Sequence, residues 1–309
     1  MTTLRASIDI GSNSILLLVV DVDNNFEVLA NESNVTGLGR DLDKNKKFIQ
    51  VAMDESFEVL KKYKKICHDL SVPADQIIAT ATEASRVSQN AFEFFKKVEQ
   101  EIGLTIITIT GEAEAYYSAI GVLFDKNIQD ETITIMDIGG ASTELIQVEK
   151  KPTHIISSFS MPVGVVRMNN WQEEAIRLEK LEKILDDFSA QISKVSCTKL
   201  YCVAGTMTSV GNMFLKLKTF EETQVNGLEI KTTDINEMLI RYETFTPDQF
   251  LEKYPFLGKR AKTIYSGLLL SKTILDKLGT SDIYISTYGL RYGTILSGSI
   301  KDHYVWKRI

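Results

Sequence analysis

Two short segments of the chain share a pattern that is typical of phosphate binding. Residues 7–14 read SIDIGSNS and residues 136–144 read MDIGGASTE, and the aspartates Asp9 and Asp137 stand 128 positions apart. In each segment an apolar run ends in a turn of small residues, whose backbone N–H groups can surround an anion. Glycine permits a close approach, and serine and threonine add hydroxyl donors. One copy would fit an ordinary hairpin turn equally well, whereas two copies favour a pair of phosphate-binding loops.

Alternating strand and helix patterns surround these loops and must position them. Runs rich in Ile, Val and Leu predict strands over residues 4–10, 15–21, 26–33, 76–82, 104–110, 132–137, 144–149, 154–160, 199–204 and 282–286. Helices are predicted over residues 51–70, 90–101, 112–124, 172–195 and 260–277. Because strands and helices alternate and the loop pattern is repeated, we expect an α/β protein with two lobes of related topology.

Length and composition are those of a globular protein and exclude several classes. A chain of 309 residues suggests about two domains, and 44% hydrophobic with 25% charged residues is ordinary. The apolar run at residues 15–20 is far shorter than the roughly 18 residues of a membrane span, and Asp9 interrupts any signal-peptide core. The net charge is −6, so no general positive field attracts polyanions and local geometry must hold any anion.

Cysteine and histidine are scarce and scattered. The three cysteines and three histidines form no C-x-x-C pair, which argues against a disulfide framework, a zinc hydrolase and a Ser-His-Asp nucleophile. We therefore expect a cytoplasmic protein. The lysines of residues 61–65 are interpreted as a solvated helix face, so neither nucleic acid nor a membrane is expected as a partner, and a homodimer is left open.

Other phosphate-binding motifs are absent or incomplete. The Gly258-Lys259 pair lacks the upstream glycine of a Walker A loop. Residues 37–39 match half of a dinucleotide fingerprint, but Leu42 stands where its third glycine belongs. The repeated segments thus remain the principal phosphate-binding candidates.

Further motifs make the chain resemble a known family. The paired loops resemble those of the acetate and sugar kinase, Hsp70 and actin superfamily. The segments similar to motifs of one branch, the exopolyphosphatase and guanosine pentaphosphate phosphatase (Ppx/GppA) family, are ATEASRVSQN (81–90), ITGEAEA (109–115), PVGVVR (162–167), AGT (204–206) and GLRYG (289–293). They span nearly the whole chain. The resemblance implies two ribonuclease-H-like lobes of the actin-like ATPase kind, with a cleft between them.

The resemblance also implies a domain organisation. We expect an N-terminal lobe over residues 1–124 with the first loop, and a C-terminal lobe over residues 125–309 with the second. A helix within about 290–309 would pack back on the first lobe. Longer relatives append a helical domain that resembles HD phosphohydrolases, and the sequence stops near the point where it would begin. The chain thus resembles the short, two-domain form.

The activity implied is hydrolysis of a terminal phosphoanhydride, with polyphosphate or guanosine pentaphosphate (pppGpp) as substrate. Such chemistry needs a positioned water, a base and cations around the phosphoryl group. Glu114 matches the family's catalytic glutamate, although without the motif it would only complement a helix dipole. Arg86 is expected to clamp phosphate oxygens, the alternative being an ion pair with Glu83. Glu112 is expected to be structural.

The two loops supply the remaining candidates. Phosphate is expected to contact Ser12, Asn13, Ser14, Gly139, Gly140, Ser142 and Thr143. Carboxylates are hard donors, so Asp137 and Glu144 would hold Mg²⁺ or another divalent cation, with Asp9 contributing through water. Gly205 and Thr206 match a segment near the nucleotide in superfamily kinases, although a strand-to-helix turn explains them equally well.

Two departures from the family pattern bear on substrate preference and rate. Ala141 replaces a glycine, which would cost on the order of 1 kcal/mol if that position needs a positive φ. Ala113 replaces a glutamate beside the expected base. Two alternatives stay open: a superfamily kinase that uses ATP, and a sensor that binds polyphosphate or pppGpp without hydrolysing it.

Overall fold

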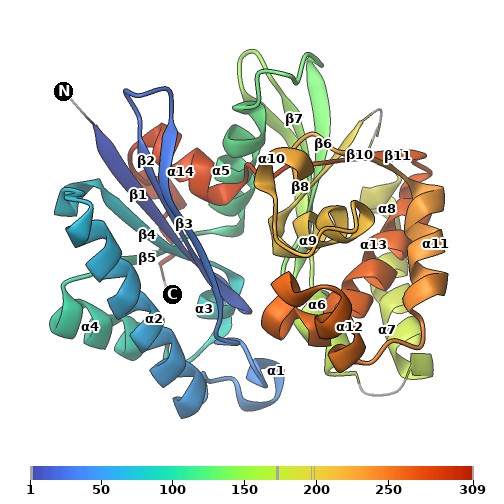
Figure 1. The fold of residues 1–309 in the computed structure, drawn as a ribbon, viewed down its shortest axis with the longest axis horizontal. Coiled ribbons are helices and arrows are strands. Elements are labelled where there is room, and N and C mark those ends of the chain that lie inside the picture. The colour runs from blue at the N-terminus through green and yellow to red at the C-terminus, as the bar shows by residue number, and fades with distance from the viewer. Residues whose placement is uncertain (1–2, 172–173, 196, 198, 308–309) are drawn as a thin grey trace. The chain divides into compact units, whose positions relative to one another are not determined.

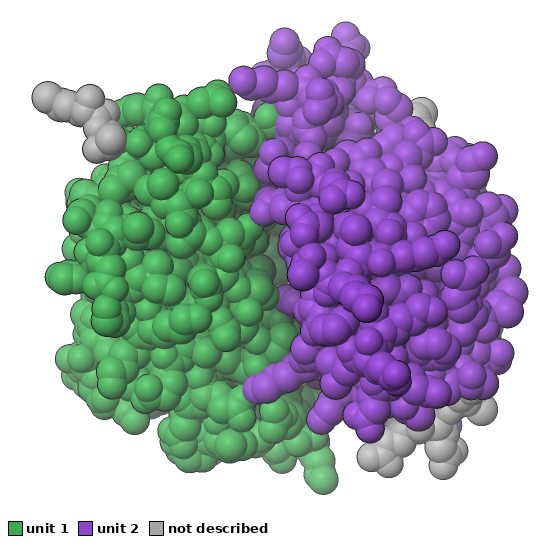
Figure 2. Space-filling view, in the orientation of Figure 1, with its two compact units in different colours: residues 1–124, 290–309 green, residues 125–289 purple. Residues whose placement is uncertain are grey.

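The chain forms two compact units in the computed structural model, which describes residues 3–171, 174–195, 197 and 199–307. Unit 1 comprises residues 1–124 and 290–309, and unit 2 comprises residues 125–289 (Figure 2). Each unit is built on its own β-sheet (Figure 1). Residues 290–309 therefore belong with the N-terminal unit.

The sheet of unit 1 has the strand order β3-β2-β1-β4-β5. Its strands are β1 (Leu4–Ile10), β2 (Ser14–Asp21), β3 (Glu27–Val35), β4 (Ile77–Ala81) and β5 (Ile106–Thr108). The first three form an antiparallel meander, and β4 and β5 run parallel to β1. Because parallel strands end at the same edge, the segments that follow β1, β4 and β5 all begin there.

Helices lie on both faces of this sheet. They are α1 (Leu42–Asn45), α2 (Gln50–Asp69), α3 (Glu83–Val87), α4 (Ala91–Ile102), α5 (Gly111–Leu123) and α14 (Leu290–Ser297), with 3-10 turns η1 (Ala74–Gln76) and η3 (Asp302–Tyr304). Ile8 and Ile10 of β1 join the core beneath α2 and α4. Ser7 points the other way, 2.7 Å from the Thr294 hydroxyl of α14. Because side chains alternate along a strand, Asp9 faces the α5 and α14 side.

The sheet of unit 2 repeats this topology, in the order β10-β11-β9-β6-β7-β8. Its strands are β6 (Thr132–Ile138), β7 (Thr143–Glu149), β8 (His154–Met161), β9 (Leu200–Val203), β10 (Glu229–Lys231) and β11 (Asp282–Ile285). The meander β6-β7-β8 corresponds to β1-β2-β3, β9 runs parallel to β6, and β11 runs parallel to β9. The prediction of two related α/β lobes is confirmed.

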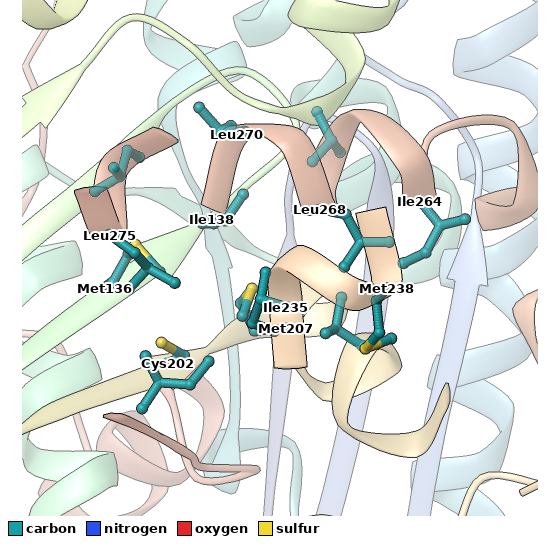
Figure 3. Close-up of a cluster of buried hydrophobic side chains, with 14 of the residues drawn as sticks. Met136, Ile138, Cys202, Met207, Ile235, Met238, Ile264, Leu268, Leu270 and Leu275 are labelled. Carbon is teal, nitrogen blue, oxygen red and sulfur yellow. The ribbon is translucent and has the colours of Figure 1, made fainter. Parts of the chain in front are cut away.

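One large apolar core holds unit 2 together. Its helices are α6 (Val165–Asn169), α7 (Glu174–Asp187), α8 (Ser189–Ile192), α9 (Ala204–Phe214), α10 (Glu222–Val225), α11 (Thr232–Tyr242), α12 (Pro247–Lys253) and α13 (Ile264–Leu278), with the 3-10 segment η2 (Pro255–Lys262). Met136 and Ile138 of β6 point into this core, which also contains Leu268 of α13 (Figure 3). Asp137 stands between them in the strand, so it faces away from the core.

Several predicted helices differ from the observed ones. The helix expected over 172–195 is divided at Phe188, and residues 172 and 173 lie outside the described part of the chain. The helix expected from residue 260 begins at Ile264, because residues 255–262 form a 3-10 segment kinked at Gly258. The C-terminal helix ends at Ser297, before Gly298 with φ +72°. Helices α9, α11 and α12 were not predicted.

The surface agrees with a solvated lysine face on α2. Lys62 pairs with Glu32 at 2.7 Å, and Lys65 pairs with Asp69 one turn further along the helix. Both lysines are exposed, as a solvated face requires, and each is paired with a neighbouring acid. None of the helices in the described ranges combines the length and the apolarity needed to cross a membrane.

Candidate functional site

The first predicted phosphate loop is a tight hairpin between β1 and β2. The N–H of Gly11 donates to the Ser14 carbonyl at 3.0 Å, which closes the turn. The Ser12 carbonyl accepts from Gly39 N at 2.7 Å. In the described part of the chain, the N–H groups of Ser12 and Asn13 donate to no other residue. The carbonyl groups of Ser12 and Ser14 are therefore already hydrogen-bonded, whereas the N–H groups of Ser12 and Asn13 are available to an anion, as an anion-binding turn requires.

The second loop has the same construction 128 residues later. Gly139 N donates to the Ser142 carbonyl at 3.0 Å, and the Gly140 carbonyl accepts from Val166 N at 2.8 Å. No residue among those described accepts from the N–H of Gly140 or Ala141. The duplication in sequence is thus a duplication of hydrogen-bond geometry.

Ala141 and Gly164 decide whether the second loop is strained. Ala141 is not among the residues with positive φ, so alanine carries no left-handed penalty at this position. Gly164 lies directly under the loop, where a Cβ would be 2.5 Å from the Gly140 carbonyl carbon and 2.6 Å from Ala141 N. Glycine is therefore required at residue 164 and not at residue 141, because the backbone of the second loop packs directly against Gly164.

The β6 and β7 strands bring Asp137 and Glu144 directly opposite each other. Cross-strand partners project on the same face, so the two carboxylates are neighbours. Glu144 is buried, and its Oε1 accepts a 2.6 Å hydrogen bond from the Ser160 hydroxyl. Thr143 faces the other side and donates to the Val163 carbonyl at 2.6 Å. The Thr143 hydroxyl thus fastens the loop to the scaffold.

The donors present fit a Mg²⁺ site of few protein ligands. Among the residues that the structure describes, no three His, Cys, Asp or Glu side chains converge as a metal cage. Mg²⁺ commonly takes one or two carboxylates and keeps several waters, which suits the Asp137 and Glu144 pair. In unit 1, Asp9 is partly exposed, but its Oδ1 is buried without a hydrogen-bond partner among the described residues. Such an unsatisfied oxygen is suited to a cation or its water.

Glu114 and Arg86 form an ion pair in unit 1. Glu114 lies in the first turn of α5, which is capped by Thr110, whose Oγ1 accepts from Ala113 N at 3.1 Å. Arg86, on α3, donates from Nη1 and Nη2 to Glu114 Oε2 at 3.1 and 3.2 Å. Arg86 Nη1 also donates to the Ile109 carbonyl at 2.8 Å. Glu114 Oε1 bonds to no residue of the described chain, which leaves it for a water molecule.

Burial controls the charge of the two acids on this face. It raises the pKa of Glu114, and the neighbouring Arg86 guanidinium opposes the rise. Burial, together with the negative charge of Glu114, raises the pKa of Asp9 to about 7, while Arg291 acts in the opposite direction. Unit 1 therefore holds two carboxyl groups whose pKa values burial raises, a frequent property of functional sites.

Arg291 is a member of this site that sequence reasoning did not single out. It lies on α14 and donates from Nη1 to the Leu17 carbonyl and to Asn31 Oδ1, both at 2.8 Å. Its position within the GLRYG segment, 282 residues after Asp9, was the signal that could have suggested a role. Only the packing of α14 on β1 shows that Arg291 influences Asp9.

Gly205 and Thr206 lie in the first turn of α9, which begins at Ala204 directly after β9. Ala204 has a φ of +69°, a left-handed conformation that is unfavourable for alanine. The Arg260 guanidinium lies beside Gly205, 2.9 Å from the position that a Cβ would take. Thr206 is buried, and its methyl group packs against Gly267 of α13. Gly205 and Thr206 thus follow a strand-to-helix turn whose backbone strain is at Ala204. A contact of the two residues with substrate stays a prediction.

The predicted site residues thus fall into two groups. Unit 1 brings Asp9, Arg86 and Glu114 to one face of its sheet. Unit 2 places Asp137 and Glu144 beside the loop of residues 139–142. Glu112 is exposed and takes no part in the Arg86 pair.

Comparisons with known proteins show which family the sequence resembles. The Ppx/GppA phosphatase family model matches residues 18–301. The chain is 32% identical to a bifunctional 3-dehydroquinate synthase/phosphatase of Fusobacterium nucleatum, over 96% of this chain and 46% of that protein. It is 29% identical to a guanosine-5'-triphosphate,3'-diphosphate pyrophosphatase of Aeromonas salmonicida, over 94% and 58%. The chain thus spans about half the length of these curated relatives.

Solved structures share the fold. An exopolyphosphatase from Cytophaga hutchinsonii matches with a TM-score of 0.85 and 24% identity, over 96% of this chain and 99% of that one. The Aquifex aeolicus member of the Ppx/GppA family matches with a TM-score of 0.79 and 24% identity, over 96% and 97%. These matches confirm the predicted actin-like fold class with two sheets. Since the family model covers most of the sequence, the chain belongs to the Ppx/GppA phosphatase family.

Proposed function

We propose that this protein is a Mg²⁺-dependent phosphoanhydride hydrolase that releases orthophosphate from the end of polyphosphate or from pppGpp. The observation that carries the proposal is the partly buried Glu114 carboxylate, oriented through one oxygen by Arg86. It lies in the same unit as a hairpin loop with unused N–H donors. The names of two similar proteins, an exopolyphosphatase and a guanosine pentaphosphate pyrophosphatase, support the substrate class.

Glu114 would act as the general base. A water held by Glu114 Oε1 attacks the terminal phosphorus, and its proton passes to the carboxylate as the new P–O bond forms. The bond from phosphorus to the bridging oxygen breaks, and its electrons remain on the leaving phosphate. Because burial raises the pKa of Glu114, the carboxylate is a stronger base than an exposed glutamate. Such a base contributes roughly 10² to 10⁴ in rate.

Arg86 would both orient the base and bind phosphate. A guanidinium has five N–H donors, and the contacts with Glu114 and Ile109 use only those on Nη1 and Nη2. The Nε–H has no partner in the described part of the chain. The Nε–H would donate a hydrogen bond to a phosphoryl oxygen and so stabilise the negative charge that develops as the bridging bond breaks.

The loops would bind the phosphate oxygens through the unused N–H groups of Ser12, Asn13, Gly140 and Ala141, with Ser14, Gly139 and Ser142 as neighbours. In unit 2, Asp137 and Glu144 would hold Mg²⁺. In unit 1, Asp9 would contribute to cation binding through a water molecule. When bound, the cation neutralises negative charge on the substrate and the leaving phosphate. Thr143 supports the loop through its bond to Val163.

The compartment and oligomeric state stay predictions. Cys67, Cys197 and Cys202 are free thiols in the structure, as a reducing cytoplasm would keep them. That the protein forms a homodimer, and that it binds neither nucleic acid nor a membrane, also stay predictions from the sequence.

The test is to incubate the purified protein with long-chain polyphosphate, pppGpp or ATP, with Mg²⁺ or with EDTA, and to measure orthophosphate. Mg²⁺-dependent release from polyphosphate or pppGpp supports the proposal. Transfer of the ATP γ-phosphate to an acceptor without orthophosphate would identify a kinase. Tight binding of polyphosphate or pppGpp without release would identify a sensor, and either result would overturn the proposal.

A further inference from the structure

The C-terminal segment of unit 1 lies along the free edge of its sheet. We call residues 299–306 the C-terminal strap; it lies beside β5, the edge strand (Figure 1). Val305 forms an antiparallel bridge with Ile109. Thr110 N donates to the Tyr304 carbonyl, and Trp306 N donates to the Thr108 carbonyl, both at 2.9 Å. The strap thus pairs with the chain where β5 gives way to α5.

The strap also holds the next turn of α5 through two tyrosines. The Tyr117 hydroxyl donates to the Ser299 carbonyl at 3.3 Å and accepts from Lys301 N at 3.1 Å. Lys301 Nζ lies 3.2 Å from the Tyr116 hydroxyl and 4.7 Å from the centre of its ring. The Tyr304 ring packs against both Tyr116 and Tyr117, at centroid distances of 5.3 and 5.7 Å. These tyrosines follow Glu114 by two and three residues.

The junction of β5 and α5 is therefore held from both sides. From inside the sheet, Ile109 N donates to the Ala81 carbonyl at 3.0 Å, and Arg86 donates to the Ile109 carbonyl. From the edge, the strap accepts from Thr110 N and donates to the Thr108 carbonyl. Ile109 therefore contacts both Arg86 and the strap, and Thr110 both caps α5 and bonds to the strap. A displacement of the strap would therefore change the position of Glu114 relative to Arg86.

We propose that the C-terminal strap is a positioning segment that fixes the first turn of α5 and thereby the geometry of Glu114 against Arg86. The catalytic part of the proposal rests on the proposed function. The strap contributes no group to the reaction, and its effect is on how long Glu114 stays aligned. Loss of the strap contacts therefore slows turnover more than it weakens substrate binding.

The test removes one strap donor while it keeps the chain length. Trp306→Pro lacks the N–H that bonds to Thr108, and Val305, at φ −75° and ψ 121°, already has the extended conformation that precedes proline. Trp306→Ala keeps the N–H and loses only the ring. Lys307→Pro is the matched proline control, because Lys307 N donates to no residue in the described ranges.

Two measurements decide the outcome. Hydrogen exchange of the peptide covering residues 108–118 is expected to be about tenfold faster in Trp306→Pro, since one backbone hydrogen bond is lost. In the same variant kcat per folded molecule is expected to fall about tenfold with KM within about twofold. Trp306→Ala and Lys307→Pro are expected to match the wild type in exchange rate and in the ratio of kcat to KM.

The two levels of the proposal fail separately. Unchanged exchange in Trp306→Pro would overturn the strap's hold on α5. Faster exchange with unchanged kcat would overturn its role in positioning Glu114. If the wild type releases no orthophosphate from any substrate, the proposed function fails and the catalytic part fails with it, whereas the exchange measurement still decides whether the strap holds the helix. A loss of activity explained by a smaller folded fraction alone, with kcat per folded molecule preserved, would also count against positioning.

Discussion

Arg86 Nη1 lies 3.1 Å from Glu114 Oε2 and donates at the same time to the Ile109 carbonyl, 2.8 Å away. The sequence offered Glu83 as the alternative partner of Arg86, and the observed ion pair is with Glu114, 28 residues away. The pair is only about 15% exposed on either side, so water screens it weakly. It fixes one carboxylate oxygen and leaves Oε1 for water, which is the arrangement that a general base requires.

Glu114→Gln is expected to remove nearly all phosphate release, by roughly 10² to 10⁴, because the amide cannot accept the proton of the attacking water. Substrate binding should persist, since the loops are untouched. Orthophosphate release and calorimetric binding of polyphosphate measure the two effects. Glu112→Gln, in the same helical turn but exposed, is the control and should keep its activity. Full activity in Glu114→Gln would show that another group is the base.

Arg86→Gln is expected to move the acidic limb of the pH profile of kcat/KM to higher pH. The guanidinium lowers the pKa of Glu114, so its loss raises that pKa further, and a base must be deprotonated to act. Arg86→Lys keeps the positive charge and should move the limb less, although it lacks the fork that reaches both Glu114 and Ile109. The rate should fall in both variants. An unshifted limb in Arg86→Gln would contradict the assignment of that limb to Glu114.

Asp9→Asn is expected to be more stable than the wild type at high pH. The native Asp9 carboxyl has a pKa of about 7 against an ordinary 3.8, so the folded state holds this proton more tightly. Its contribution to stability is complete below about pH 4 and is lost as pH rises through about 7. Above pH 7 the variant should gain up to about 4 kcal/mol in free energy of unfolding, and near pH 4 the two proteins should match.

Urea unfolding in EDTA at pH 4 and pH 8 measures this Asp9 effect. Asp75→Asn, at an exposed position of the same unit, is the control and should show no such gain. If Asp9→Asn has the same stability as the wild type at pH 8, the Asp9 environment is not as unfavourable to charge as the structure indicates.

Gly164→Ala is expected to destabilise unit 2 by about 1–3 kcal/mol, because the new Cβ would lie 2.5 Å from the backbone of Gly140. The effect is steric, since Gly164 has a φ of −140° that alanine adopts without strain. Gly289→Ala is the matched control, as its nearest neighbour would be 4.0 Å away. Chemical unfolding compares the two. Equal stabilities would show that the second loop yields to the methyl group.

Asp137→Asn is expected to raise the Mg²⁺ concentration for half-maximal phosphate release by about tenfold or more, because one of two hard donors is lost. Mg²⁺ should also raise the unfolding temperature of the wild type more than that of the variant at the same concentration, which tests binding without turnover. Glu149→Gln, at the exposed end of β7, is the control and should respond to Mg²⁺ as the wild type does. An unchanged response in Asp137→Asn would place the cation elsewhere.

The sequence by itself determined the elements and the duplication. Strands β1, β2 and β6 were predicted closely, because alternating apolar side chains and small-residue turns are local properties of the backbone. The 128-residue spacing of Asp9 and Asp137 predicted two loops of one construction, and the Gly11 and Gly139 hydrogen bonds share their geometry. The missed helix α9 begins at Ala204, whose φ of +69° is not expected for alanine, whereas α12 begins with a local capping box of Thr246 and Gln249 that the sequence analysis did not use.

Only the tertiary structure decided which side chains meet. Glu114 could be predicted as a base, but its pairing with Arg86, the influence of Arg291 on Asp9, and the support of the second loop by Gly164 follow from packing between elements far apart in the chain. The same holds for the strap on β5 and α5. Local periodicity specifies which face a residue presents, whereas the charge and orientation of a side chain depend on the neighbours that folding brings to that face.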